Sequence, residues 1–483
     1  AQTLLFREFI TTFEGNDISV GLFFASWFLW VGLGAVLIRR WDRFVEILLR
    51  HIELLFLLYI PAFVLQLLLI LQVRELAGIA SYNLLAIQTM VLWSMAVNAP
   101  VSLVTGVLFP VACRWIEQTN AFPVSRVYVL EAVGSFAGGL AVTALLAWHV
   151  PTVQVSLVLA FVLAVPLLGV SVLSPTRSRR IAVALSLATV ACASTILLTK
   201  ADAVLVRRLQ EAKWSRLLPR EALHGAFLTA QAEYLYGQYA GQWIAMREGS
   251  VCEALPNEEE AGRTVATVLC QNLQAKRILV IGSGLAMCNR LLMLPQIEHV
   301  AWAHPDTEYT ERLLEILPSE FAVNDPRFHP VTGEVRRYLA DAKDGFDLVV
   351  VNLTDAAGSA FNRYYTVEFY ERVRSSLRWG GAVATAIAGG ENVMGAELAA
   401  LGASTRATLA EVFGNQVLAP GEQTWWIASD SAELTDDPAA LRDRFASIEG
   451  SERVFPPAGL LSVYLPDQIA RATAAYDKAE IGR

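Results

Sequence analysis

The segment ILVIGSG, residues 278–284, joins a short apolar run to a Gly-Ser-Gly turn. A run of this kind predicts a buried strand, and glycines at its carboxyl end let the backbone approach a nucleotide. We expect a helix to follow the turn. Gly282 and Gly284 are therefore candidate cofactor-binding positions in a Rossmann-like α/β domain.

Five further apolar runs alternate with helical stretches along the chain. Strands separated by helices indicate βαβ units and a mainly parallel sheet. We expect a small β subdomain at residues 233–276, the α/β domain at 277–430 and a C-terminal tail at 431–483. The five runs are VAWAH (300–304), FHPVTG (328–333), DLVVVN (347–352), GAVATAI (381–387) and TWWIAS (424–429).

The first 200 residues differ in composition and predict a polytopic α-helical membrane domain. Hydrophobic residues make up 54% of the whole chain, and they are concentrated in this part. A bilayer core about 30 Å thick takes roughly twenty helical residues to cross. An amphipathic juxtamembrane linker is expected at 201–232. Six runs are long enough to cross, at 18–38, 52–72, 86–112, 128–150, 152–173 and 181–199.

Basic residues in the loops predict the orientation of these spans. They gather after the first, third and fifth runs, which indicates that the odd-numbered loops are cytoplasmic. This orientation places the globular domain in the periplasm of a bacterium, outside its inner membrane. The basic linker at 201–232 gives the opposite signal. The opening AQTLLFREFI (1–10) is typical of the end of a further helix, so we expect an upstream piece.

Charge and cysteine content exclude several classes of function. The net charge is −8 at pH 7 and no basic stripe alternates with aromatic residues, which argues against a nucleic-acid partner. The five cysteines are scattered, without zinc or iron–sulfur spacing, so no metal site is expected. A Cys252–Cys270 disulfide is the alternative to unpaired thiols, which the pattern favours.

Glu131 is the candidate functional residue of the membrane half. It lies in YVLEAVGSFAGG (128–139), and an ionisable group inside an apolar span is a functional candidate by default. The alternative is a hydrated position close to the cytoplasmic interface. Gly134 and Gly138 form a small-xxx-small pattern that is typical of close helix packing.

Several short motifs point to a known family. The membrane half contains RE (7–8) and WFLWVGLGAVL (27–37), and the globular half contains YGQY (236–239), VIGSG (280–284), DPR (325–327), GE (333–334), DLVVVNLTD (347–355) and YTVEFY (365–370). Over nearly its whole length the chain resembles the membrane-fused bacterial spermidine synthases (polyamine aminopropyltransferases). The resemblance implies a seven-stranded, methyltransferase-like sheet behind a small β-domain. It also implies decarboxylated S-adenosylmethionine as cofactor and a diamine as acceptor.

The chain departs from that family where its ligands need charge. By resemblance, the glycine-loop aspartate is matched by Leu285, the ribose-binding glutamate by His304 and the general base by Asn352. An imidazole makes at most one directed bond to a diol, and an amide has no basic lone pair. Glu334 matches the adenine-contacting aspartate, and Asp355 is a residual carboxylate beside the degenerate base position.

Loss of charge alongside retention of the fold favours a pseudoenzyme that acts as a scaffold or accessory subunit of a membrane protein complex. Its partners are then the lipid bilayer and other subunits, and no cofactor is expected. The first alternative is a membrane-anchored transferase on an unusual acceptor, in which Asp355 and Glu334 act and the cofactor is S-adenosylmethionine or its decarboxylated form. The second alternative makes Glu131 a proton or ligand site.

Overall fold

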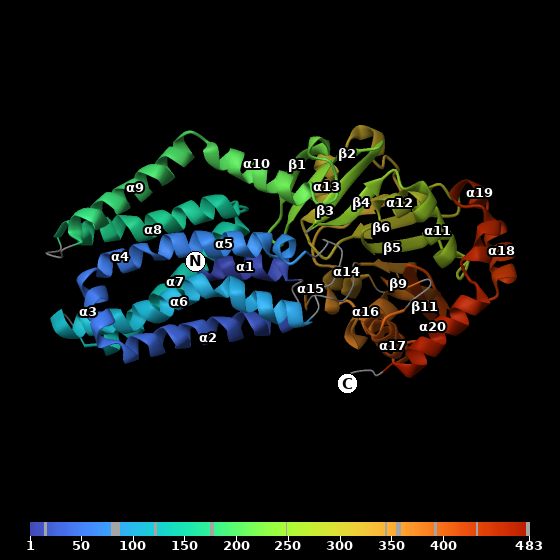
Figure 1. Ribbon diagram of the computed structural model, residues 1–483. Coiled ribbons are helices and arrows are strands. Elements are labelled where there is room, and N and C mark those ends of the chain that lie inside the picture. Colours follow the sequence, from blue (N-terminus) through green and yellow to red (C-terminus); the bar gives the residue numbers. More distant parts are fainter. Residues whose placement is uncertain are drawn as a thin grey trace. The chain divides into compact units, whose positions relative to one another are not determined.

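The computed structural model describes residues 1–13, 17–78, 87–119, 123–173, 178–247, 249–342, 345–353, 359–390, 394–430 and 433–479. The chain forms two compact units (Figure 1). The helical unit consists of Ala1–Glu221 with Glu248–Ser250, and the α/β unit consists of Ala222–Arg247 with Val251–Arg483. Asp355 lies outside the described residues.

The helical unit contains the apolar segments expected from the sequence. Among the described residues, six helical segments are long and apolar enough to cross a membrane: Asp17–Arg40, Ile52–Leu76, Ile87–Gln118, Ser125–Ala147, Thr152–Leu173 and Arg179–Leu198. Each of the six predicted runs forms one of them. The helices are α1 (Gln2–Thr12), α2 (Asp17–Arg40), α3 (Asp42–Arg50), α4 (Ile52–Leu57), α5 (Tyr59–Leu76), α6 (Ile87–Thr119), α7 (Ser125–Ala147), α8 (Thr152–Leu173), α9 (Arg179–Leu198) and α10 (Ala201–Trp214).

Helices α2 and α6 approach each other through glycine. A Cβ at Gly106 would lie 2.2 Å from the carbonyl oxygen of Val31, so only glycine allows this contact. Small residues at such crossings let two helix backbones come together. The small-xxx-small pattern of α7 differs, because a Cβ at Gly134 or Gly138 would have no described atom within 4 Å. The close packing expected there is not made within the described part of the chain.

Buried amides join three of the apolar helices. Asn98 on α6 accepts a hydrogen bond from Gln66 Nε2 on α5 at 3.1 Å and donates one to Ser26 Oγ on α2 at 2.7 Å. The oxygen of Gln66 also accepts from the backbone amide of Val101 at 2.9 Å. The three side chains are fully or almost fully buried. Hydrogen bonds of this kind fix the register of helices in apolar surroundings.

The segment expected as a linker at 201–232 divides between the two units. α10 belongs to the helical unit, where Gln154 Nε2 donates to the Asp202 carboxylate at 2.8 Å. Strand β1 (Leu223–Leu228) pairs antiparallel with β2 (Glu233–Tyr239) and belongs to the α/β unit. The small β subdomain therefore begins at Leu223, and the boundary predicted at residue 233 is wrong because it separates two paired strands.

Two sheets form the α/β unit. The small sheet has the order β1-β2-β3-β4, with β3 (Gln242–Arg247) and β4 (Ser250–Leu255). The large sheet has the order β10-β11-β9-β8-β5-β6-β7, and its β10–β11 and β11–β9 pairs are antiparallel while the others are parallel. This is the methyltransferase-like topology that the resemblance implied. Its strands are β5 (Arg277–Gly282), β6 (His299–Ala303), β7 (Phe328–Pro330), β8 (Phe346–Asn352), β9 (Leu377–Ala388), β10 (Asn415–Ala419) and β11 (Gln423–Ser429).

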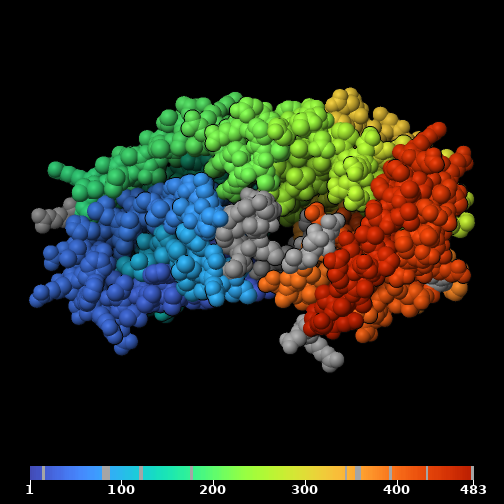
Figure 2. All heavy atoms as spheres, turned by 45° about the vertical axis from the view of Figure 1, so that its right-hand side comes forward, coloured from blue at the N-terminus to red at the C-terminus, as the bar shows by residue number. Residues whose placement is uncertain are grey.

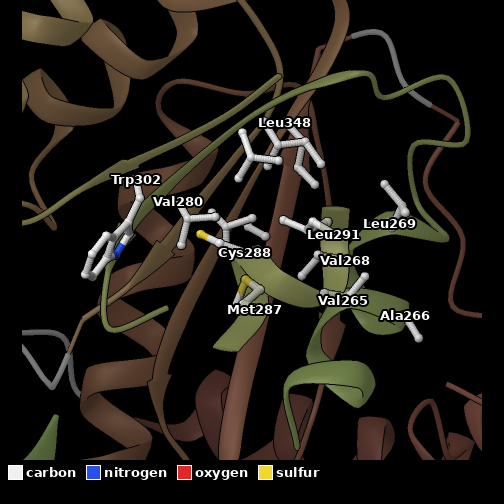
Figure 3. Close-up of a cluster of buried hydrophobic side chains, with 14 of the residues drawn as sticks. Val265, Ala266, Val268, Leu269, Val280, Met287, Cys288, Leu291, Trp302 and Leu348 are labelled. Atoms are coloured by element: carbon white, nitrogen blue, oxygen red, sulfur yellow. The ribbon is translucent and has the colours of Figure 1, made fainter. Parts of the chain in front are cut away.

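Helices cover both faces of the large sheet. Ile278 and Val280 of β5 join one core and Leu279 and Ile281 the other, which explains why the strand is apolar throughout. Figure 3 shows part of the first core, with side chains of α11 (Glu258–Leu269) and α12 (Leu285–Leu292). The first core also includes side chains of α13 (Tyr309–Ile316) and α18 (Pro438–Ala446). The second includes side chains of α14 (Val335–Asp341), α16 (Val367–Ser376), α17 (Ala396–Ala410) and α20 (Pro466–Lys478).

The C-terminal segment, expected as a tail at 431–483, packs as helices against the α/β unit. Figure 2 shows it in red as a continuous strip on the surface. The buried Tyr464 hydroxyl donates to the carbonyl oxygen of Thr267 on α11 at 2.8 Å. Tyr476 of α20 packs so closely on α17 that a Cβ at Gly402 would lie 2.1 Å from its ring. The remaining short elements are η1 (Arg220–Ala222), η2 (Ser319–Phe321), α15 (Ser359–Asn362), α19 (Ser451–Val454) and η3 (Pro457–Ser462).

Gly106→Ala is expected to destabilise the helical unit by about 1–3 kcal/mol, because the added methyl group overlaps the Val31 carbonyl and forces α2 and α6 apart. Gly134→Ala is the matched control, since the space beside Gly134 is open. The unfolding midpoint of the full-length protein in mild detergent measures both effects. Equal midpoints for the two variants would contradict the described helix contact.

Candidate functional site

The candidate site lies at the carboxyl ends of β5, β6 and β8, where open parallel sheets bind their ligands. Gly282 at the end of β5 pairs with Asn352 at the end of β8. β6 pairs with β5 on its other side, and His304 follows it directly. The sheet thus brings the glycine loop, His304 and Asn352 to one edge.

The glycine loop is fixed by both neighbouring strands. Gly282 has a φ of +100°, and a Cβ there would lie 2.1 Å from the carbonyl oxygen of Asn352. The amide of Ser283 donates to that same oxygen at 3.0 Å. On the other side, the buried indole of Trp302 donates through Nε1 to the carbonyl oxygen of Gly282 at 2.9 Å. The loop therefore needs glycine for its conformation and for the close approach of β8.

The side-chain amide of Asn352 is hydrogen-bonded at both ends. Its Nδ2 donates to the carbonyl oxygen of Ser283 at 2.5 Å. Its Oδ1 accepts from Nε2 of Gln423, on β11, at 2.7 Å. Asn352 therefore connects β8, the glycine loop and β11, and its oxygen already has a donor.

His304 is a buried neutral imidazole. Its Nδ1 accepts from the backbone amide of Asp306 at 3.0 Å, and its ring stacks on Tyr309 with the centroids 4.0 Å apart. Burial lowers the pKa of His304 to about 3, and the charge of Arg247 acts in the same direction. Since Nδ1 is an acceptor, the neutral ring carries its proton on Nε2. A single N–H is left at the position that resemblance assigns to a ribose-binding carboxylate.

Asp306, two residues after His304 in the sequence, bonds to the small sheet. Asp306 accepts hydrogen bonds through Oδ2 from Thr229 Oγ1 at 2.6 Å and from the Tyr234 hydroxyl at 3.0 Å. Its Oδ1 accepts from the amide of Glu308 at 3.3 Å. Asp306 is only 1% exposed. This carboxylate therefore cannot take over the ribose-binding role at the end of β6.

A second buried carboxylate reaches the glycine loop from the small sheet. Glu253 on β4 accepts the amide of Gly284 at 2.7 Å through Oε1 and the amide of Leu285 at 3.3 Å through both oxygens. Its side chain is 4% exposed. Burial raises the pKa of Glu253 to about 7, although the two amides act against the rise. The amides of Gly284 and Leu285 at the start of α12 are thus occupied from within the chain.

Comparison with known proteins shows which family this part of the chain is similar to. Residues 263–396 match the family described as Spermine/spermidine synthase domain. The matched residues lie in the α/β unit, which is called the synthase domain below. Over 169 residues the chain is 30% identical to Polyamine aminopropyltransferase 2 of Hyperthermus butylicus, which covers 34% of this chain and 55% of that protein. Over 103 residues it is 32% identical to Polyamine aminopropyltransferase 2 of Ralstonia nicotianae, which covers 20% of each.

These matches are partial. The chain spans about half the length of the first curated relative and a fifth of the second. Among solved structures, the spermidine synthase of Thermotoga maritima is similar over 52% of this chain and 88% of that chain, with 14% identity and a TM-score of 0.41.

The remaining predicted positions of the synthase domain have different surroundings. The side chain of Leu285, matched to the glycine-loop aspartate, is fully buried in the first core. Glu334 precedes α14 and is exposed. Glu131 belongs to the helical unit and is exposed on α7. The structure therefore brings Gly282, Gly284, His304 and Asn352 together, while Glu131 is part of the other unit.

The buried carboxylates of the helical unit include Glu8, which the sequence analysis named only within the RE motif at 7–8, and Glu53, which it did not name. Glu8 Oε1 accepts from Thr152 Oγ1 at 2.8 Å, and Glu53 Oε2 accepts from Ser178 Oγ at 3.1 Å. Burial of such side chains depends on neighbouring helices, which a span prediction does not include.

Decarboxylated S-adenosylmethionine carries positive charge on its sulfonium and its amine, and the described residues of the synthase domain do not fit it. The three family carboxylates are matched by a buried leucine, a neutral histidine and a hydrogen-bonded asparagine. Glu253 is directed at backbone amides and is almost fully buried. We therefore assign no reaction step to this cofactor.

Glu253 and Gln423 were missed by the sequence analysis, and a partial signal exists for one of them. Glu253 shares strand parity with the buried Leu255, so alternation along β4 directs it inward. A glutamate on the inward face of a strand must find hydrogen-bond donors. No comparable local signal marks Gln423, whose role depends on β11 lying near the end of β8 through β9.

The stability of the protein is expected to fall as the pH rises from about 4.5 to about 7. Because the pKa of Glu253 is raised in the folded state, the folded protein holds a proton that the unfolded chain has released in this range. The contribution of Glu253 to the free energy of unfolding is on the order of 3 kcal/mol. It is fully present below about pH 4.5 and is lost above about pH 7.

Glu253→Gln keeps the side-chain shape and is expected to flatten this pH dependence. Unfolding midpoints of the full-length protein at pH 5 and pH 8 measure the difference. If the unfolding midpoint changes equally between pH 5 and pH 8 in the wild type and the variant, Glu253 does not titrate in this way.

Proposed function

We propose that this chain is a polytopic membrane protein whose synthase domain does not transfer aminopropyl groups and serves as a scaffold or accessory subunit of a membrane protein complex. The observation that carries the proposal is the hydrogen bonding of Asn352. At the position that resemblance assigns to the general base, an amide donates to Ser283 and accepts from Gln423. An amide held in this way does not take a proton from an amine.

Loss of the general base greatly lowers the expected rate of aminopropyl transfer. The attacking amine must be neutral, and a positioned base typically contributes about a hundredfold to ten-thousandfold in rate. The cationic cofactor and acceptor also need anionic contacts. His304 is neutral and Asp306 is bonded to the small sheet, so neither supplies such a contact.

The helical unit supports a place in a membrane. Six described segments are long and apolar enough to cross one, and α7 carries large exposed side chains such as Val133, Phe136 and Leu140. These surfaces suit lipid or the helices of another subunit. The basic loops after the first, third and fifth runs favour a bacterial inner membrane with the synthase domain in the periplasm.

A transferase that acts on an unusual acceptor is the alternative function. The exposed carboxylate of Glu334 favours it, because this side chain remains available at the carboxyl edge of the sheet. Asp355 would then act as the residual base. The other alternative, a proton or ligand site at Glu131, predicts that Glu131→Gln abolishes the cellular function.

Purified full-length protein is expected to release no 5′-methylthioadenosine above the uncatalysed rate from decarboxylated S-adenosylmethionine and a panel of diamines. The reason is the missing base at Asn352. Asn352→Asp is also expected to stay inactive, because its carboxylate would face the Ser283 carbonyl oxygen that now accepts a hydrogen bond. The Hyperthermus butylicus relative is the positive control. Wild-type turnover within about a hundredfold of that relative would contradict the proposal.

The scaffold role predicts that the protein copurifies in mild detergent with another membrane protein at fixed stoichiometry. Native mass spectrometry measures the ratio. Glu334→Gln is expected to leave the complex intact, since a scaffold binds through its outer surface and not through the cleft. If the chain runs alone and Glu334→Gln abolishes its cellular function, the transferase alternative is correct.

A further inference from the structure

The backbone amides at the start of α12 already hold a carboxylate. We propose that Glu253 is a built-in ligand of the glycine loop, which closes this loop to nucleotides that carry a carboxylate or a phosphate. The inference deepens the proposed function and rests on it, because it concerns a cleft that has lost its cofactor contacts. Glu253 is the residue that excludes such ligands from the cleft.

The geometry matches that of an anion bound at a helix start. α12 has eight residues, Leu285–Leu292, and the amides of Gly284 and Leu285 are two of the donors at its amino end. Unpaired amides in this position bind carboxylates and phosphates, because the helix dipole also favours negative charge there. Glu253 Oε1 lies 2.7 Å from the first amide nitrogen, and both of its oxygens lie 3.3 Å from the second.

A second anion would meet two obstacles at this loop. Above about pH 7, where Glu253 is ionised, its charge repels the anion. At any pH, the anion finds the amides of Gly284 and Leu285 already bonded. It could bind only by displacing Glu253 from a position that is 4% exposed. Glu253 is anchored on a paired strand of the small sheet and is not part of a free loop. The exclusion is therefore a property of the fold.

The titratable groups that face Glu253 include Cys288 of α12 and Tyr309 of α13. Burial and the charge of Glu253 raise the pKa of both. Neither a thiol nor a phenol carries positive charge at any pH, so neither offers a countercharge. The Tyr309 hydroxyl has no hydrogen-bond partner among the described residues. Compensation of the carboxylate therefore depends on the loop amides, and removal of Glu253 should leave those amides without a partner in a buried space.

Chemical rescue of Glu253→Ala in the full-length protein tests the proposal. The variant is expected to unfold several degrees below the wild type, because it leaves two buried donors unbonded. Sodium formate is expected to restore at least half of that loss, since a small carboxylate fits the vacated position. Sodium chloride at equal ionic strength should not restore it. Glu253→Gln is the matched control, because its amide oxygen still accepts from the loop and formate should have no effect.

The result that overturns the proposal is a Glu253→Ala protein that formate stabilises no more than it stabilises the wild type. Hydrogen exchange on the wild type gives a second test that does not require the variant to fold. The Gly284 amide is expected to exchange at least roughly a hundredfold more slowly than an open amide, because its donor is bonded in the closed form. Exchange at the open rate would also overturn the proposal.

Titrations with two cofactors separate this inference from the proposed function. Saturable stabilisation of the wild type by S-adenosylmethionine, which has a carboxylate, would overturn the exclusion by Glu253. Stabilisation by decarboxylated S-adenosylmethionine alone would contradict the proposed function and leave the exclusion intact. Neither compound is expected to shift the wild-type unfolding midpoint.

Discussion

The close approach of the glycine loop to the end of β8 is the constraint on which the candidate site depends. Because Gly282 has no side chain, the backbone of Asn352 can lie directly against the glycine loop. The side-chain amide of Asn352 then reaches the carbonyl oxygen of Ser283. An aspartate in this position would place two oxygens against each other, whereas asparagine supplies the donor that the loop needs. Gln423 then satisfies the amide oxygen. The substitution that removes the base also completes the hydrogen bonding of the loop.

Two buried carboxylates are likewise bonded to groups within the protein. Glu253 extends from the small sheet to the glycine loop, and Asp306 extends from the large sheet to Thr229 and Tyr234 of the small one. Together they join the two sheets of the α/β unit by hydrogen bonds from buried side chains. Carboxylates that hold a fold together are not available to a cationic ligand. The synthase domain thus keeps its architecture, and these two side chains hold its two sheets together.

The sequence predicted features with local signals and missed those that depend on tertiary contacts. The apolar run at 278–282 with its glycines predicted β5 and the loop, and the six long apolar runs predicted the helices of the other unit. Strand β10, with the sequence NQVLA, was missed because it lies at the sheet edge, where its first residue is exposed. Strand β1 was missed because His224 and Gly225 interrupt its apolar pattern. The partners of Glu253 and Asn352 come from distant segments, and no local pattern indicates them.

A structure of the full-length protein determined with saturating decarboxylated S-adenosylmethionine tests the central claim most directly. The account predicts that Glu253 remains on the amides of Gly284 and Leu285, that Asn352 remains between Ser283 and Gln423, and that no ordered nucleoside lies at the carboxyl ends of the strands. An adenosyl nucleoside at that edge of the sheet, with its ribose hydroxyls against His304, would contradict the account.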